Sequence, residues 1–321
     1  MPYWECVTRS FRIAWARKYL WLIALFSGEA GGFSFNYSQS TSNTSSQTDF
    51  ATFQNQVTTW LADHVALIVL VAVVWLLLVI AFFILAAVCE GATVRASAEH
   101  DAERPFGLGW AWRSGVGTMW VVIRFRLLFL LLYLPLFLLF AGFVVGVLAG
   151  LGHQNGGVVA SFVGLGFLLV LIAIPYLIYL FLLDRLGTRA VVLEQLMAWP
   201  AIVRAHRLVF KRLGRTLLVW LLGIAVAIVV GIALACVFAL IFAPLVLVGV
   251  AIGATNSTAV VPLVVVGVVV LFAISLVVQS FFAAQGSTYW TLAFRRLDID
   301  YVPAPSYQFQ PPPPAPPAPA Q

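Results

Sequence analysis

The chain has 321 residues, of which 62% are hydrophobic and only 9% are charged, and its formal net charge is +6. A soluble domain carries about 25% charged residues, so a water-soluble fold is excluded, because a folded surface in water cannot hide this excess of apolar side chains. In a membrane protein the positive charge is expected beside anionic headgroups, and we expect no nucleic-acid partner.

The first 18 residues combine four basic side chains, Arg9, Arg12, Arg17 and Lys18, with bulky apolar residues at roughly helical spacing. This pattern predicts a basic amphipathic helix on a membrane surface. The apolar stretch at residues 19–35 comes next and is short for a membrane span. A signal peptide, a re-entrant segment and a full crossing all fit it, but no A-x-A cleavage site follows, which disfavours the signal peptide.

Five further runs are long enough to cross a hydrocarbon core of about 30 Å. None of them contains Asp, Glu, Lys or Arg. Because the runs are continuous rather than alternating, helices are expected and a β-barrel is not. We therefore predict an all-α fold, a polytopic transmembrane helical bundle. Its six spans are expected at residues 19–35, 65–88, 127–151, 158–183, 217–242 and 259–284.

The distribution of charge along the chain predicts its orientation. The loops at residues 36–64, 152–157 and 243–258 contain no Lys or Arg, whereas all 18 basic residues lie in the segments on the other side. Basic segments are retained in the cytoplasm, so we expect a multi-pass protein of the cell membrane with both termini cytoplasmic. The N-terminal cations share that side only if residues 19–35 cross, which gives six crossings.

Three segments share one layout. Residues 9–26, 110–132 and 199–222 each place Arg among apolar residues and then lead into an apolar run. This layout predicts interfacial amphipathic helices that precede helical hairpins, and it suggests a threefold internal repeat. The alternative is that any cytoplasmic boundary converges on such a pattern without repetition.

The remaining segments predict an outer loop and a tail. Residues Ser34–Thr59 are rich in Ser, Thr, Asn and Gln, which is typical of a flexible exposed loop. The chain ends in PPPPAPPAPAQ, and such a run favours an extended, disordered conformation. We therefore expect an integral membrane domain at residues 1–300 and a disordered, Pro-rich cytoplasmic tail at residues 301–321.

Motifs for catalysis are missing from the sequence. No HExxH, GxSxG, Walker or GxGxxG pattern occurs. The densest polar cluster, Glu99–Arg104, predicts a solvated loop rather than a metal site, because neighbouring loop residues rarely converge on one ion. We expect a protein that is not an enzyme, with no catalytic residue, no cofactor and no metal.

Small residues recur every four positions in the run at residues 127–151. Gly142, Gly146 and Gly150 lie on one stripe of the expected helix. Such stripes let a second helix approach closely, because apolar burial alone does not drive helix pairing in lipid. We expect these glycines to pack against another span.

A small-molecule or lipid transporter, or a channel, is the alternative function. Transporters break their helices to build binding sites near the bilayer midplane, and Pro135, Pro175, Pro244 and Pro262 lie within or beside the spans. Gln279 is one of the few polar residues there. Ion-coupled transport is disfavoured, because ionisable residues inside the spans are its usual mark.

The leading interpretation is a non-catalytic integral membrane protein, a scaffold or accessory protein. It would engage anionic lipids or a partner through its basic amphipathic helices, since each basic residue near an anionic surface contributes about 1 kcal/mol. A protein partner or a homo-oligomer is compatible with the sequence. The candidate lipid-headgroup contacts are Arg12, Arg17, Lys18, Arg124, Arg126, Arg204, Arg207, Lys211, Arg212 and Arg215.

The helix-plus-hairpin units and the closing TYWTLAFRRLD (Thr288–Asp298) resemble a group of uncharacterised bacterial membrane proteins. These proteins are similar to the membrane domain associated with glycerophosphoryl diester phosphodiesterases. In that family a separate barrel domain, opened by a His-Arg-Gly motif, performs catalysis. Here His206-Arg207 is followed by Leu208, so the resemblance implies the membrane domain without the catalytic domain, and no catalytic residue is carried over.

Overall fold

The computed structural model describes residues 2–27, 60–61, 64–152, 156–255 and 257–297. Every regular element within these residues is an α-helix, which confirms the predicted all-α fold. In chain order the helices are α1 (Pro2–Ala16), α2 (Tyr19–Phe26), α4 (Val65–Asp101), α5 (Leu108–Gly152), α6 (Gly156–Leu193), α7 (Ala198–Lys211), α8 (Leu213–Thr255) and α9 (Ser257–Leu297).

Five helices, α4, α5, α6, α8 and α9, are long and apolar enough to cross a membrane. Each contains one of the five long apolar runs, so the chain is a multi-pass membrane protein. Of the first predicted span the structure describes α2, whose eight residues are too few to cross a bilayer alone. Residues 28–35, most of the predicted outer loop and the predicted tail lie outside the described residues.

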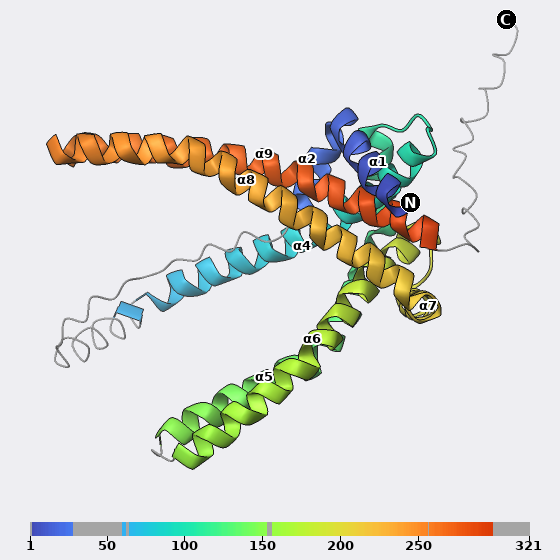
Figure 1. Ribbon diagram of the computed structural model, residues 1–321, viewed down its shortest axis with the longest axis horizontal. Helices are drawn as coiled ribbons and strands as arrows, with labels where there is room; N and C mark the ends of the chain where they lie inside the picture. The colour runs from blue at the N-terminus through green and yellow to red at the C-terminus, as the bar shows by residue number, and fades with distance from the viewer. Residues whose placement is uncertain (1, 28–59, 62–63, 153–155, 256, 298–321) are drawn as a thin grey trace, which may run out of the picture.

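The five long helices diverge from one common end (Figure 1). α5 runs beside α6 and α8 beside α9, while α4 leaves in a third direction, so three arms extend from the region where α1, α2 and α7 lie. We call this region the hub. It comprises α1, α2, α7 and the parts of the long helices at residues 85–126, 180–193, 213–222 and 280–297. All 18 lysines and arginines lie in the hub or in its connections.

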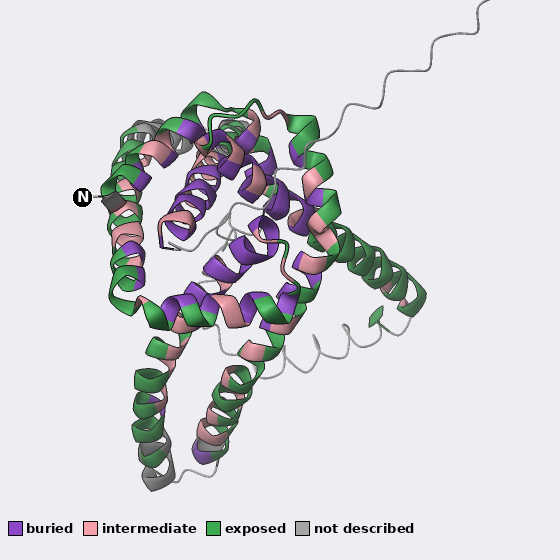
Figure 2. Cartoon of the chain, turned by 90° about the vertical axis from the view of Figure 1, so that its right-hand side faces the viewer, coloured by how far each residue is buried: buried purple, intermediate pink, exposed green. Residues whose placement is uncertain are grey.

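Burial differs sharply between the hub and the arms (Figure 2). Buried residues gather in the hub, whereas the arms expose apolar side chains along their length. In the most apolar 18-residue window of α4, none of the residues is buried. A surface this large and apolar requires lipid around it.

Side chains from α5, α6 and α9 form the largest apolar core of the hub. Phe125, Leu186 and Phe294 are completely buried there, and each such side chain contributes about 1.5–3 kcal/mol relative to its exposed state. Gly187 lets the Phe125 ring lie against α6, because a Cβ at this position would be 2.6 Å from the ring. The same core includes Val94 of α4, so it joins helices that belong to all three arms.

α1 and α2 close the hub against α4 and α9. The Gln285 side chain of α9 donates a hydrogen bond to the Ser10 hydroxyl of α1 at 3.1 Å, and both residues are buried. Cys6 of α1 is also buried, and burial raises the pKa of its thiol. A protonated, enclosed thiol serves packing rather than reactivity.

Ion pairs tie α1 and α9 to the end of α4. Arg9 lies 2.8 Å from the Asp101 carboxylate, and Arg295 donates to the same carboxylate. The expectation of a solvated loop over Glu99–Arg104 is therefore wrong for its first residues. α4 continues to Asp101 because two arginines from other helices hold its last carboxylate in place.

The segment at residues 110–126 is not a separate interfacial helix. α5 is continuous from Leu108 to Gly152, so the expectation of a distinct amphipathic helix ahead of this span is wrong. Ala111 and Val122 are buried, and packing of this part of α5 on α4 and α6 keeps it in line with the span. Among the described helices, the short basic ones are α1, which leads into α2, and α7, which leads into the long helix α8.

The arm made by α5 and α6 has its tight contact away from the predicted glycine stripe. A Cβ at Gly142 would meet no heavy atom within 4 Å, so no helix approaches closely there. On α6, a Cβ at Gly166 would overlap the ring of Phe143. Gly142 therefore does not make this contact. Gly150 is buried, and the packing role of Gly146 and Gly150 stays a prediction.

The closest helix crossing lies in the hub, between α4 and α5. A Cβ at Gly91 of α4 would lie 2.5 Å from Thr118 Oγ1, and one at Gly115 of α5 would overlap the backbone carbonyl oxygen of Val88. Backbone can approach backbone here only because neither position carries a side chain.

Buried charge lies beside this crossing. Glu90 of α4 is buried, and Arg126 of α5 donates a hydrogen bond to its carboxylate. Arg189 of α6 is completely buried and donates to the backbone carbonyl of Ser287 on α9 at 3.4 Å. A buried charge without such bonds is costly, so these contacts restrict how the helices can pack.

We expect Gly115→Ala to destabilise the protein, because its Cβ would overlap the Val88 carbonyl oxygen. Overpacking of this kind costs about 1–3 kcal/mol. Gly117→Ala is the matched control on the same helix, since a Cβ at Gly117 meets open space. Thermal unfolding of the detergent-solubilised protein should give a lower midpoint for Gly115→Ala alone. Equal midpoints would contradict the close crossing.

Arg126→Leu should destabilise the hub by about 3–5 kcal/mol, because Glu90 would stay buried without its partner. Arg124→Leu, an exposed site two residues away, should change stability by about 0.5 kcal/mol or less. Replacing both Glu90 and Arg126 by Leu should recover most of the loss, since no charge is then left buried. Denaturant unfolding in detergent measures all three; a double variant as unstable as Arg126→Leu would argue against the pair.

Candidate anionic-ligand site

The hub carries an excess of positive charge. Seven acidic residues lie among the described residues, and at least six of them are paired with arginine. Because 18 lysines and arginines face these seven acids, the hub surface has a positive potential, which attracts anions. The paired acids are Glu5, Glu90, Glu99, Asp101, Glu103 and Glu194.

Exposed cations and exposed tryptophans share α1 and the turn after it. Arg12, Arg17 and Lys18 are exposed, and Trp4 and Trp15 are 56% and 69% exposed. Indole rings favour the headgroup level of a membrane, because one part of the ring is apolar and its N–H is polar. The combination is typical of a helix that rests on an anionic membrane surface.

α7 and the start of α8 repeat this combination. Arg207, Lys211 and Arg215 are exposed, and so are Trp199 and Phe210. The opposite face of α7 is buried in the hub. The helix is therefore amphipathic, as the sequence predicts, but its apolar face packs on protein.

The other predicted lipid contacts divide by where they point. Arg124 is exposed on α5, whereas three further arginines bond to groups inside the hub. These bonds are Arg126 to Glu90, Arg204 to Glu194 at 3.4 Å, and Arg212 to the Leu297 carbonyl oxygen at 2.8 Å. Their positions suit hub stability more than contact with headgroups.

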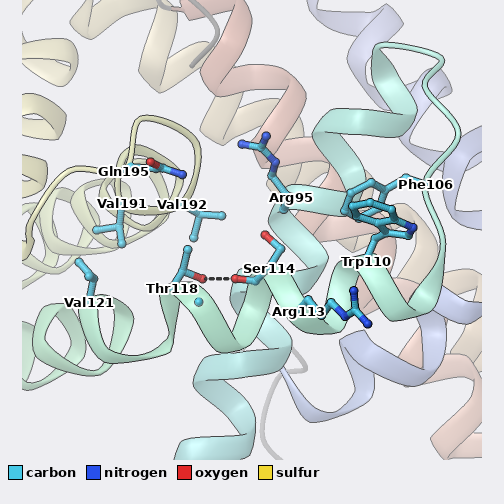
Figure 3. Close-up of a pocket in the computed structure, with 11 residues that line it drawn as sticks. Arg95, Phe106, Trp110, Arg113, Ser114, Thr118, Val121, Val191, Val192 and Gln195 are labelled. Carbon is cyan, nitrogen blue, oxygen red and sulfur yellow. Dashed lines mark hydrogen bonds between the residues drawn. The ribbon is translucent and has the colours of Figure 1, made fainter. Parts of the chain in front are cut away.

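A cavity of about 410 Å³ lies between α4, α5 and the end of α6 (Figure 3). Arg95 of α4 and Arg113 of α5 line it, and none of the described residues in its wall is acidic. Ser114 and Thr118 add hydroxyl groups between the two arginines and the apolar part of the wall. The cavity is suited to a negatively charged group that accepts hydrogen bonds.

The apolar wall of this cavity has two ends. Figure 3 shows Phe106 and Trp110 together at one end, near Arg113. Val121 and the neighbouring Val191 and Val192 lie at the other end. A ligand that fills the cavity therefore needs an apolar part as well as a charged one.

Internal bonds hold the polar wall in place. Arg95 lies 3.0 Å from Glu99, one turn further along α4, and the Thr118 hydroxyl donates to the Ser114 carbonyl oxygen at 3.1 Å (Figure 3). Gln195 follows the end of α6 in the left-handed region, with φ at 54°. The wall is thus largely set before any ligand arrives.

A second cavity, of about 450 Å³, lies between α6, α8 and α9 and is almost entirely apolar. Its polar groups are engaged within the protein: Tyr289 donates to the Val219 carbonyl oxygen at 2.7 Å, and Gln285 donates to Ser10. What remains exposed in this cavity is an apolar wall, which suits an acyl chain.

Sequence reasoning did not single out Phe106, Trp110, Ser114, Thr118 or Gln195. Four of them, Phe106, Trp110, Ser114 and Thr118, recur every four residues, a spacing that places them along one helix face. Gln195 comes from a distant stretch that only the fold brings to this face. Among the described residues, no group of three His, Cys, Asp or Glu side chains is placed to hold a metal ion.

Comparison with known proteins gives a family and no activity. The model of a family of unknown function, DUF7544, matches residues 7–301, which covers nearly all of the hub and the arms. No match was found among curated proteins or among solved structures. The chain therefore belongs to DUF7544, a family of unknown function.

Proposed function

We propose that the protein is a non-catalytic scaffold or accessory protein of the cell membrane whose hub lies on the cytoplasmic side and engages anionic lipid headgroups. The observation that carries the proposal is that exposed cations and exposed indole rings share the same two regions, α1 and α7. Anionic headgroups satisfy the cations, and the headgroup level accommodates the rings.

The magnitudes support this attachment. Arg12, Arg17 and Lys18 at α1, with three more cations at α7, are exposed, and each contributes about 1 kcal/mol beside an anionic surface. The arms already anchor the protein, so these charges decide which lipids gather around it rather than whether it binds a membrane.

The positions of the helix ends support six crossings. α1 and α2 are in the hub, whereas α4 begins at Val65, at the far end of its arm (Figure 1). The chain therefore has to pass from the hub to the far side of the bilayer before α4 begins. Residues 19–35 are the apolar stretch available for that passage, as a crossing that starts with α2.

The likeness to the membrane domain of glycerophosphoryl diester phosphodiesterases belongs to this proposal as well. On this likeness the chain corresponds to the membrane part of such proteins.

A lipid transporter is the competing function, and one observation favours it. The apolar cavity between α6, α8 and α9 has satisfied polar groups and room for an acyl chain. Pro135 and Pro175 lie inside α5 and α6, which continue through them. Without a broken helix or a polar path at these prolines, the headgroup-binding proposal has the better support.

Neutralising the exposed cations of α7 should reduce the enrichment of anionic lipid around the protein. The variant is Arg207→Gln with Lys211→Gln and Arg215→Gln, and it removes about 1 kcal/mol of attraction per charge. Extraction into polymer-bounded discs, followed by lipid mass spectrometry, gives the ratio of phosphatidylglycerol to phosphatidylethanolamine. We expect that ratio to fall at least twofold towards the bulk value.

Arg204→Gln with Arg212→Gln is the control, because these side chains bond inside the hub. It should lower thermal stability and leave the lipid ratio unchanged. Because exposed charges are screened by salt, about 0.5 M salt should weaken the enrichment of anionic lipid around the unaltered protein. A triple α7 variant that keeps the full enrichment would remove the basis of the proposed function.

Reporter fusions test the first crossing. A fusion after residue 45 should report the outside of the cell, because the cations of α1 hold the preceding segment in the cytoplasm. Fusions after residues 105 and 195 should report the cytoplasm, and one after residue 155 the outside. A cytoplasmic signal after residue 45 would reduce the count to five crossings.

A further inference from the structure

The cavity between α4, α5 and α6 lies just beyond the apolar runs of all three helices. Along α5, Val121 is six residues from the start of its run at Leu127, a distance of about 9 Å at 1.5 Å per residue. Arg95 is seven residues past the end of the α4 run at Val88, which is about 10 Å. The apolar end of the cavity therefore lies near the headgroup level, and its arginine end lies further from the bilayer.

The wall of the cavity changes from apolar to charged with distance from the arms. On α5 the order is Val121, Thr118, Ser114 and then Arg113, which is about 20 Å from Leu127 along the helix. Figure 3 shows the same order in space, with the hydroxyls between the valine end and the arginine end. An amphiphile matches this gradient if its chain points towards the bilayer and its anionic head towards the arginines.

We propose that this cavity binds one anionic phospholipid, whose phosphate lies against Arg95 and Arg113 and whose acyl chain leaves past Val121. Arg113 and the Ser114 hydroxyl approach the phosphate from α5, and the Arg95 side chain, which points another way in Figure 3, turns towards it from α4. Trp110 and Phe106, at the arginine end, cover the headgroup of the ligand. No acidic lining residue opposes the phosphate among those described.

The inference rests on the proposed function in one respect, namely that the hub lies beside an anionic leaflet. It differs in kind from the attraction by α1 and α7. Exposed cations gather many lipids loosely, whereas a walled cavity of about 410 Å³ holds one lipid with defined contacts.

Removal of one arginine tests the charged end. Native mass spectrometry of the full-length protein in detergent, titrated with phosphatidylglycerol, should show one lipid that stays bound at higher collision energy than the rest. Arg113→Gln should weaken that single site about tenfold or more, because charge-assisted hydrogen bonds to phosphate are lost. Arg124→Gln removes an exposed α5 charge outside the cavity and should leave the site intact.

Filling the cavity tests its volume independently of charge. Gly117 lines the cavity, and a Cβ there meets no atom within 4 Å, so Gly117→Leu places a side chain in the cavity without disturbing the buried core. Gly109→Leu adds the same side chain on the same helix, at a position that also meets open space but does not line the cavity. Loss of the single bound lipid in Gly117→Leu alone supports the proposal.

Two further ligands separate the source of the phosphate. Glycerol 3-phosphate supplies the anionic group without a chain, and diacylglycerol supplies the chains without a phosphate. If the cavity binds an anionic phospholipid, neither compound should raise the Tm of the protein as phosphatidylglycerol does. An equal shift with glycerol 3-phosphate would assign the cavity to a soluble phosphate compound and overturn the lipid assignment.

The outcomes also separate this inference from the proposed function. If the triple α7 variant loses its lipid enrichment while Arg113→Gln binds like the unaltered protein, the cavity proposal is wrong and the function stands. If Arg113→Gln loses the single lipid while the α7 variant keeps its enrichment, the cavity proposal stands and the function fails. An equal loss in Arg113→Gln and Arg124→Gln would also overturn the cavity site.

Discussion

The long helices hold one another chiefly at one end, and the rest of the structure depends on this constraint. Along the arms the helices expose apolar side chains to lipid, and lipid offers no hydrophobic drive for them to associate. Association therefore depends on contacts that lipid cannot replace. The hub supplies them: glycines that admit a backbone, buried hydroxyl and amide bonds, and paired charges.

Charge in the hub has two separate roles. Pairs such as Glu90 with Arg126 lie inside and restrict how α4 and α5 cross, because breaking one partner leaves a buried charge. The cations outside this network stand on α1 and α7 beside exposed indoles. The arginines inside the hub therefore specify its packing. The exposed cations give it a positive surface.

The sequence predicts the helices well, because length and continuous apolarity are enough to define a membrane helix. It does not predict that residues 110–126 continue into α5, since an amphipathic pattern describes a helix on lipid and a helix packed on protein equally well. Nor does it tell Arg126 from Arg124, two residues apart. Only the fold brings Glu90 to Arg126. Likewise, only the fold gathers Arg95, Arg113 and Gln195 around one cavity.

The position of that cavity links lipid binding to the arrangement of the arms. α4 leads into one arm and α5 with α6 into another (Figure 1), so a ligand that contacts both Arg95 and Arg113 joins helices of two arms. A ligand that binds only the assembled hub stabilises it by RT ln(1 + [L]/Kd). The arms are held together chiefly at the hub, so such a ligand acts where the arms have their common support. Anionic lipid would then be a structural component of the fold, and the membrane composition would set how firmly the arms are held together.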